Sequence, residues 1–101
     1  MKTIARFEIC YRQYIDAAGR KIGELPDFAR ETAAVVSLYR AMVLTRGFDA
    51  KAIALQRTGR LGTYPSCLGQ EAVGVGLASA MRPEDVLLPS YREQGAQLLR
   101  G

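Results

Sequence analysis

The chain is 101 residues long, so it can form at most one small domain with a modest buried core. Its hydrophobic content of 49% is ordinary for a globular protein and too high for a disordered one. The net charge of +4 comes from 14 basic and 10 acidic residues, and the basic residues are dispersed, which argues against a nucleic-acid-binding surface.

Several other classes of protein and site are excluded. No apolar run approaches the ~20 residues of a transmembrane helix, and the N-terminus lacks the apolar core of a signal peptide, so we expect a soluble, cytosolic protein. Cys10 and Cys67 are far apart and histidine is absent, which excludes zinc sites of Cys and His and Ser–His or Cys–His nucleophilic pairs. We expect two free, buried or partly buried thiols, and no metal site. Any acid–base chemistry would use carboxylates, a cofactor or another chain.

The first segment, residues 1–31, is predicted to be an extended N-terminal arm. Apolar residues partly alternate over residues 4–15, which favours a strand. Residues 16–20 have the composition of a turn, and residues 21–25 could return as a second short strand before Pro26. Such a β-hairpin is too small to be stable alone, so we expect the arm to pack on the rest of the protein or on a partner.

The second segment, residues 32–58, is predicted to be a long helix. Apolar residues recur at helical spacing from Val35 to Leu55. Thr32 is a candidate N-cap, and Gly59 stands where a helix often ends in a glycine. The polar positions of this helix are filled by Arg40, Arg46, Asp49, Lys51 and Arg57.

A loop over residues 61–66 is predicted to lead into a second helix that begins near Cys67 or Gly69 and ends near Met81. Glycine and alanine give this helix small side chains. Such a helix usually allows another backbone to approach closely, so we expect the helix to be buried. Residues 74–79 superficially match the dinucleotide fingerprint G-x-G-x-x-G/A, but no strand precedes them and the third small residue is a serine, which favours helix packing.

The last segment is predicted to contain a turn over residues 82–85, a short core strand over residues 86–88 and a small amphipathic segment over residues 96–100. The order of elements indicates an α/β fold class, mostly helical, with a hairpin arm and one short strand. A single strand cannot form a sheet. We divide the chain into the arm, residues 1–31, and a second region, residues 32–101.

Two places in the chain are candidate ligand sites. Tyr91 and Arg92 follow the predicted strand and are suited to an anionic, ring-bearing ligand, since arginine binds carboxylate and phosphate groups. The alternative for Arg92 is an ion pair with Glu93 or Asp85. Residues 62–66 could place a hydroxyl or a ring at the N-terminus of a helix, a natural anion site, or form an ordinary loop in which a serine caps the helix.

Several motifs over residues 35–101 occur in the order found in one enzyme family. The chain resembles the α subunit of the E1 component of 2-oxo acid dehydrogenases, of pyruvate or branched-chain type. Two short runs in residues 1–31 are similar to the N-terminal arm of bacterial members. The matching motifs after the arm are residues 38–46, 48–51, 56–57, 59–66, 68–72, 82–85 and 89–93.

The resemblance implies a thiamine diphosphate enzyme with Mg2+ that decarboxylates a 2-oxo acid and acylates the lipoyl group of an E2 partner. In that family the cofactor lies between an α and an E1 β subunit in an α2β2 assembly. The resemblance assigns Tyr91 and Arg92 to the phosphate end of the cofactor, and places Thr63 and Tyr64 near the reaction centre. Gln94 stands where many members have histidine, and glutamine does not exchange protons near neutral pH.

The family's magnesium motif, Gly-Asp-Gly followed later by asparagine, does not occur in these 101 residues. We therefore assign no catalytic residue and no metal ligand, and expect the chain alone to be inactive and to bind neither Mg2+ nor thiamine diphosphate tightly. We interpret the chain as a truncated, N-terminal part of an E1 α subunit. The alternatives are a non-catalytic interaction fragment that docks on an E1 β subunit, and an unrelated small basic binding domain.

Overall fold

A computed structural model describes all 101 residues and divides them into two units, Met1–Glu31 and Thr32–Gly101. The first unit contains one short 3-10 helix, η1 (Asp27–Arg30). The second unit contains three α-helices, α1 (Thr32–Arg57), α2 (Glu71–Ser79) and α3 (Gln94–Arg100). The two units are described separately below.

The predicted α/β fold class is wrong, because the structure contains helices and neither a strand nor a sheet. The expected core strand at residues 86–88 is irregular, and its Val86 and Leu88 side chains are 80% and 89% exposed. A strand is stabilised by backbone hydrogen bonds to a neighbouring strand, and no other segment of the chain supplies them here. The apolar run alone therefore does not form a strand.

The predicted β-hairpin in the arm is also wrong. Residues 4–13 have no regular structure, and only one isolated antiparallel bridge joins Ile15 to Lys21. The turn between these two residues does form, because Asp16 accepts hydrogen bonds of 2.9 Å from the backbone nitrogens of Ala18 and Arg20. The alternating apolar side chains before the turn stay exposed, since no second strand covers them.

The long helix is confirmed to within one residue of its predicted end. Its hydrogen bonds are local, and the chain leaves the helix at Gly59, whose φ of 70° lies in the left-handed region that favours glycine. Beyond this point the backbone nitrogen of Arg60 donates to the carbonyl oxygen of Leu55 at 2.9 Å. These bonds satisfy carbonyl groups that the end of a helix otherwise leaves free.

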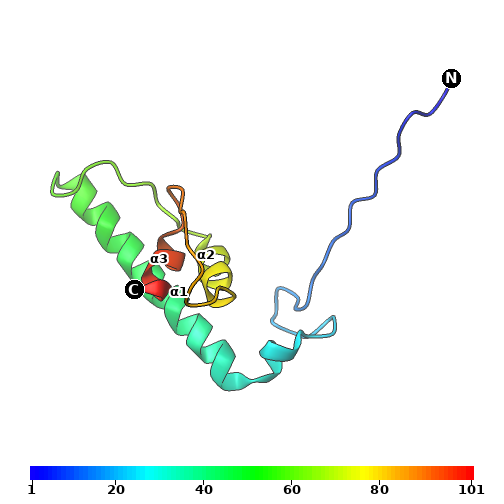
Figure 1. Cartoon of the computed structure of the whole chain (residues 1–101), viewed down its shortest axis with the longest axis horizontal. Helices are drawn as coiled ribbons and strands as arrows, with labels where there is room; N and C mark the ends of the chain where they lie inside the picture. Colours follow the sequence, from blue (N-terminus) through cyan, green and yellow to red (C-terminus); the bar gives the residue numbers. More distant parts are fainter. The chain divides into compact units, whose positions relative to one another are not determined.

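The core of the second unit lies where α2 and α3 pack on α1 and on each other (Figure 1). Glycines bring the backbones close: a Cβ atom added at Gly74 would lie 3.1 Å from the backbone nitrogen of Ala96. A Cβ atom at Gly95 would lie 3.2 Å from the hydroxyl oxygen of Thr45. The close approach expected of the small-sided helix is therefore confirmed, although only one of its faces is buried.

Apolar side chains also lie on the surface of this unit. On α1, Tyr39, Val43 and Leu44 are exposed, and on α2 so are Val73 and Leu77. The buried part is small, because it is built mainly from alanine, glycine and a few polar side chains. None of the helices combines the length and apolar character needed to cross a membrane.

Candidate functional site

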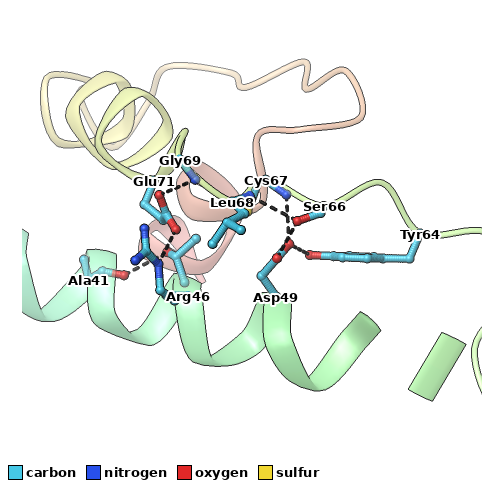
Figure 2. A network of polar contacts seen from close by, with 10 residues as sticks. Ala41, Arg46, Asp49, Tyr64, Ser66, Cys67, Leu68, Gly69 and Glu71 are labelled. Carbon is cyan, nitrogen blue, oxygen red and sulfur yellow. Dashed lines mark hydrogen bonds and ion pairs between the residues drawn. The ribbon is translucent and has the colours of Figure 1, made fainter. Parts of the chain in front are cut away.

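A buried carboxylate on α1, that of Asp49, organises the loop between α1 and α2 (Figure 2). It accepts hydrogen bonds from the Tyr64 hydroxyl at 2.8 Å, the Ser66 hydroxyl at 2.6 Å and the Cys67 backbone nitrogen at 2.8 Å. Asp49 is only 4% exposed. Burial raises the pKa of this carboxyl, but the three hydrogen bonds outweigh it, so the net pKa lies below its ordinary value and the group is ionised.

A second buried carboxylate, Glu71, stands in the first turn of α2. One oxygen accepts a 2.7 Å bond from Nε of Arg46, and the other accepts a 2.9 Å bond from the backbone nitrogen of Gly69 (Figure 2). The Arg46 hydrogen bond lowers the pKa of Glu71, and the same bond raises the pKa of Arg46. The middle of the loop and the start of α2 are therefore each tied to a side chain of α1.

The predicted pair Tyr91 and Arg92 lies in the irregular segment before α3. The Arg92 guanidinium donates to the carbonyl oxygen of Ser66, and its Cζ atom lies 5.4 Å from the centre of the Tyr91 ring. Arg92 forms no ion pair with Glu93 or Asp85, so the alternative role considered for it from the sequence is absent from the structure. The other N–H groups of the guanidinium have no acceptor in this chain and are open to an anion.

Gln94, the first residue of α3, bridges this segment to the loop. Its amide nitrogen donates to the carbonyl oxygens of Pro65 at 2.8 Å and Tyr91 at 3.2 Å. Its amide oxygen is buried and has no hydrogen-bond partner. Because both neighbouring groups are acceptors, the amide cannot turn over to use that oxygen there. The side chain therefore offers one unused, buried acceptor.

A cavity of about 480 Å³ brings together three of the five predicted site residues, Tyr64, Tyr91 and Gln94. Arg92 and Thr63 do not line it, and the Thr63 side chain is exposed. Burial, followed by the hydrogen bond to Asp49, raises the pKa of Tyr64, so its phenol stays protonated. The remaining lining residues are Phe48, Pro65, Gln97, Leu98 and Gly101.

A second cavity, of about 580 Å³, lies between α1 and α2 and contains none of the predicted site residues. The Arg46–Glu71 ion pair lines it together with apolar side chains such as Met42 and Val43. The Glu71 carboxylate and Nε of Arg46 in this cavity are already bonded to each other, and Glu71 also binds the loop.

Both cysteines are free thiols, as expected, but only one is buried. Cys10 lies exposed in the arm. Burial raises the pKa of the Cys67 thiol, which therefore stays protonated at neutral pH and is a poor nucleophile.

The residues fit part of the implied cofactor. The unused N–H groups of the Arg92 guanidinium, beside the ring of Tyr91, fit the oxygens of a phosphate group. No group of three or more potential metal-ligating side chains occurs in the chain, so the residues present do not form a Mg2+ site.

The sequence alone does not predict that Asp49, Arg46 and Glu71 anchor the loop between α1 and α2. From the sequence, Arg46 and Asp49 are only polar positions of the helix. One signal was available: Thr45, Asp49 and Ala52 are spaced by four and three residues, so they share one face of α1, and this face is the buried one. Small and polar residues at helical spacing marked the surface that receives the loop.

Comparisons with known proteins agree with the resemblance. The family model "Dehydrogenase E1 component" matches residues 39–101. The "3-methyl-2-oxobutanoate dehydrogenase subunit alpha" of Mycobacterium tuberculosis is 50% identical over 64 residues, which are 63% of this chain and 17% of the relative. The "Pyruvate dehydrogenase E1 component subunit alpha" of Acholeplasma laidlawii is 41% identical over 88 residues, 85% of this chain and 25% of the relative.

A plant relative adds to this picture. The "2-oxoisovalerate dehydrogenase subunit alpha 1, mitochondrial" of Arabidopsis thaliana is 36% identical over 92 residues, 91% of this chain and 19% of the relative. The chain thus spans between 17% and 25% of the length of these three relatives. No solved structure matches it. Because the family model covers more than half of the sequence and the named relatives are α subunits of dehydrogenases, the chain belongs to the dehydrogenase E1 component family.

Proposed function

We propose that the protein carrying this sequence is the α subunit of a thiamine diphosphate-dependent 2-oxo acid dehydrogenase E1. It would decarboxylate a 2-oxo acid and transfer the acyl group to the lipoyl group of an E2 partner. Membership of the family and the names of the relatives support this proposal. The observation that carries it is the Arg92 guanidinium, which stands beside the Tyr91 ring with free N–H groups and no acidic partner.

In this proposal the residues of the chain bind and orient the cofactor. When bound, thiamine diphosphate supplies the chemistry that stabilises the carbanion formed on decarboxylation. Arg92 donates charge-assisted hydrogen bonds to phosphate oxygens, and Tyr91 offers its hydroxyl and an apolar face beside them. The Gln94 amide donates a hydrogen bond to the Tyr91 carbonyl and transfers no proton. The Tyr64 hydroxyl stays protonated and donates to Asp49.

The substrate is proposed as a 2-oxo acid, with pyruvate and branched-chain 2-oxo acids as the two acids to assay. Both kinds of relative match the chain at comparable identity, so neither acid is preferred. The proposed partners are an E1 β subunit, in an α2β2 assembly, and the lipoyl-bearing E2. The proposed location is the cytosol.

The test is a titration of thiamine diphosphate, with Mg2+, into the subunit carrying this sequence after co-expression with an E1 β subunit. Arg92→Ala is expected to weaken binding by about tenfold or more, because a charge-assisted hydrogen bond to phosphate is lost. Arg40→Ala is the matched control, since Arg40 is exposed on α1 and forms no ion pair. Equal affinities of the two variants would contradict the proposed role of Arg92.

The 101-residue chain alone gives a further outcome to check. Because it lacks a metal-ligating cluster, we expect no tight, Mg2+-dependent binding of thiamine diphosphate by it. Calorimetry that found micromolar binding would overturn this expectation.

A second candidate function is a non-catalytic module that docks on an E1 β subunit. The exposed apolar side chains of α1 and α2, among them Tyr39, Leu44 and Val73, favour it, because such side chains commonly mark protein interfaces. Co-purification with the β subunit, together with no decarboxylation of either acid, would support this candidate over the enzyme.

A further inference from the structure

We propose that Asp49 is a positioning residue, which sets the location of Arg92 and Gln94 through the loop that connects α1 to α2. This inference rests on the proposed function, since it assigns a purpose to the placement of Arg92. Asp49 is bonded to neither residue. It acts through the backbone of residues 64–67.

Asp49 fixes this short segment through three hydrogen bonds. Three of its four residues donate to the one carboxylate: Tyr64 and Ser66 through their hydroxyls and Cys67 through its backbone nitrogen. The segment has no regular secondary structure, so no helix or sheet imposes its conformation. The carboxylate is nearly completely buried, and water therefore does not compete for these bonds.

The same segment holds Arg92 and Gln94, the two residues near the predicted phosphate site. The carbonyl oxygen of Pro65 accepts from the amide of Gln94, and the carbonyl oxygen of Ser66 accepts from the guanidinium of Arg92. The Ser66 carbonyl shares a planar peptide unit with the Cys67 nitrogen, which donates to Asp49. The Pro65 carbonyl shares one with the backbone nitrogen of Ser66, whose hydroxyl also donates to Asp49. The direction of both carbonyls therefore depends on the groups that Asp49 binds on either side.

The position of Arg92 is restrained before any ligand arrives. Arginine has a long, flexible side chain, and holding it in one geometry costs conformational entropy. The Ser66 carbonyl and the Tyr91 ring restrain Arg92 before any ligand arrives, and one Nη atom alone is used for this purpose. A guanidinium that is already oriented binds an anion more tightly than a free one, because less entropy is lost on binding.

Glu71 supplies the matched control. It too is a buried carboxylate that anchors this loop, but its partners are Arg46 and the backbone nitrogen of Gly69. Neither bond includes the carbonyls of Pro65 or Ser66. Loss of the Glu71 charge therefore loosens the loop without releasing the two carbonyls that hold Arg92 and Gln94.

The experiment uses the subunit carrying this sequence, assembled with an E1 β subunit, and measures the Kd of thiamine diphosphate with Mg2+ by calorimetry. Asp49→Asn is expected to raise the Kd about tenfold, the low end of the effect of removing a group that orients a ligand-binding side chain. Glu71→Gln is expected to lower the thermal midpoint as well, but to leave the Kd within about twofold of wild type.

A double variant separates positioning from general loss of stability. If Asp49 acts through Arg92, then Asp49→Asn adds little to the effect of Arg92→Ala, and the two changes are strongly non-additive. Effects of Asp49→Asn and Arg92→Ala that add, or equal weakening by Asp49→Asn and Glu71→Gln, would overturn the inference. An Arg92→Ala variant that binds like wild type would instead overturn the proposed function.

A milder pair of variants keeps the test decisive if Asp49→Asn does not fold. Ser66→Ala removes one of the three bonds to Asp49 and is expected to raise the Kd about threefold. Ser79→Ala is its control, because the Ser79 hydroxyl donates only to the carbonyl oxygen of Gly76 within α2. Equal Kd values for Ser66→Ala and Ser79→Ala would contradict the role given to Asp49.

Discussion

The two buried carboxylates of the helical unit are satisfied in different ways. Asp49 meets three neutral donors, all of them within the loop, and no cation. Glu71 meets the guanidinium of Arg46, which is 62% exposed, and one backbone nitrogen. Neutral donors fix direction and act inside the protein, whereas a partly exposed ion pair is weakened by water and salt. Asp49 therefore fixes the shape of the loop, and Glu71 fastens its end.

The largest expected difference is in stability. Asp49→Ala leaves three donors of the loop without an acceptor, so we expect the free energy of unfolding to fall by about 3 kcal/mol. Glu71→Ala leaves only the backbone nitrogen of Gly69 without an acceptor, because the exposed Arg46 side chain can bind water instead. We therefore expect the free energy of unfolding to fall by about 1.5 kcal/mol. Urea unfolding of the chain followed by circular dichroism measures both. A larger loss for Glu71→Ala would reverse the comparison.

A smaller effect, shared by the two carboxylates, is expected in the response to acid. Both carboxyls have a pKa in the folded chain below their unfolded value. Each therefore stabilises the fold fully above the ordinary carboxyl pKa of about 4, and this stabilisation is lost as the pH falls through the folded-state pKa. We expect Asp49→Asn and Glu71→Gln each to flatten the acid side of a plot of stability against pH. An unchanged acid side in both variants would show that these carboxyls are not the groups whose protonation unfolds the chain.

The smallest expected difference is in the response to salt. The Arg46–Glu71 pair is partly exposed, so its contribution should shrink when the salt is raised from about 0.05 M to about 1 M. The penalty of Glu71→Gln should shrink with it. The penalty of Asp49→Asn should stay the same, since its donors carry no charge. Unfolding curves at the two salt concentrations make this check, and equal salt dependence would remove the distinction between the two carboxylates.

The sequence predicted local structure well and long-range structure poorly. The helix over residues 32–57 was correct because its hydrogen bonds, its apolar spacing and its terminal Gly59 all lie within one segment. The strands at residues 4–15 and 86–88 were wrong because a strand needs a partner, and an apolar run does not reveal whether one exists. The fold class failed for this reason.

The candidate site was predicted in the same uneven way. Tyr64, Tyr91 and Gln94 do meet at one cavity, but the roles given to them, and to Arg92, stay predictions. Asp49 was missed because its donors come 15 to 18 residues later in the chain. An aspartate among helical polar residues looks like a solvated position until the fold brings a loop onto it.

The contact between α2 and α3 has a consequence for how this protein tolerates change. At Gly74 even a methyl group would meet the backbone nitrogen of Ala96, and α3 would have to move away. Since α3 begins at Gln94, such a shift would lengthen and weaken the 2.8 Å hydrogen bond from that side chain to the Pro65 carbonyl. Random mutagenesis should therefore find that Gly74 tolerates replacement poorly, although this residue offers no side chain to any ligand.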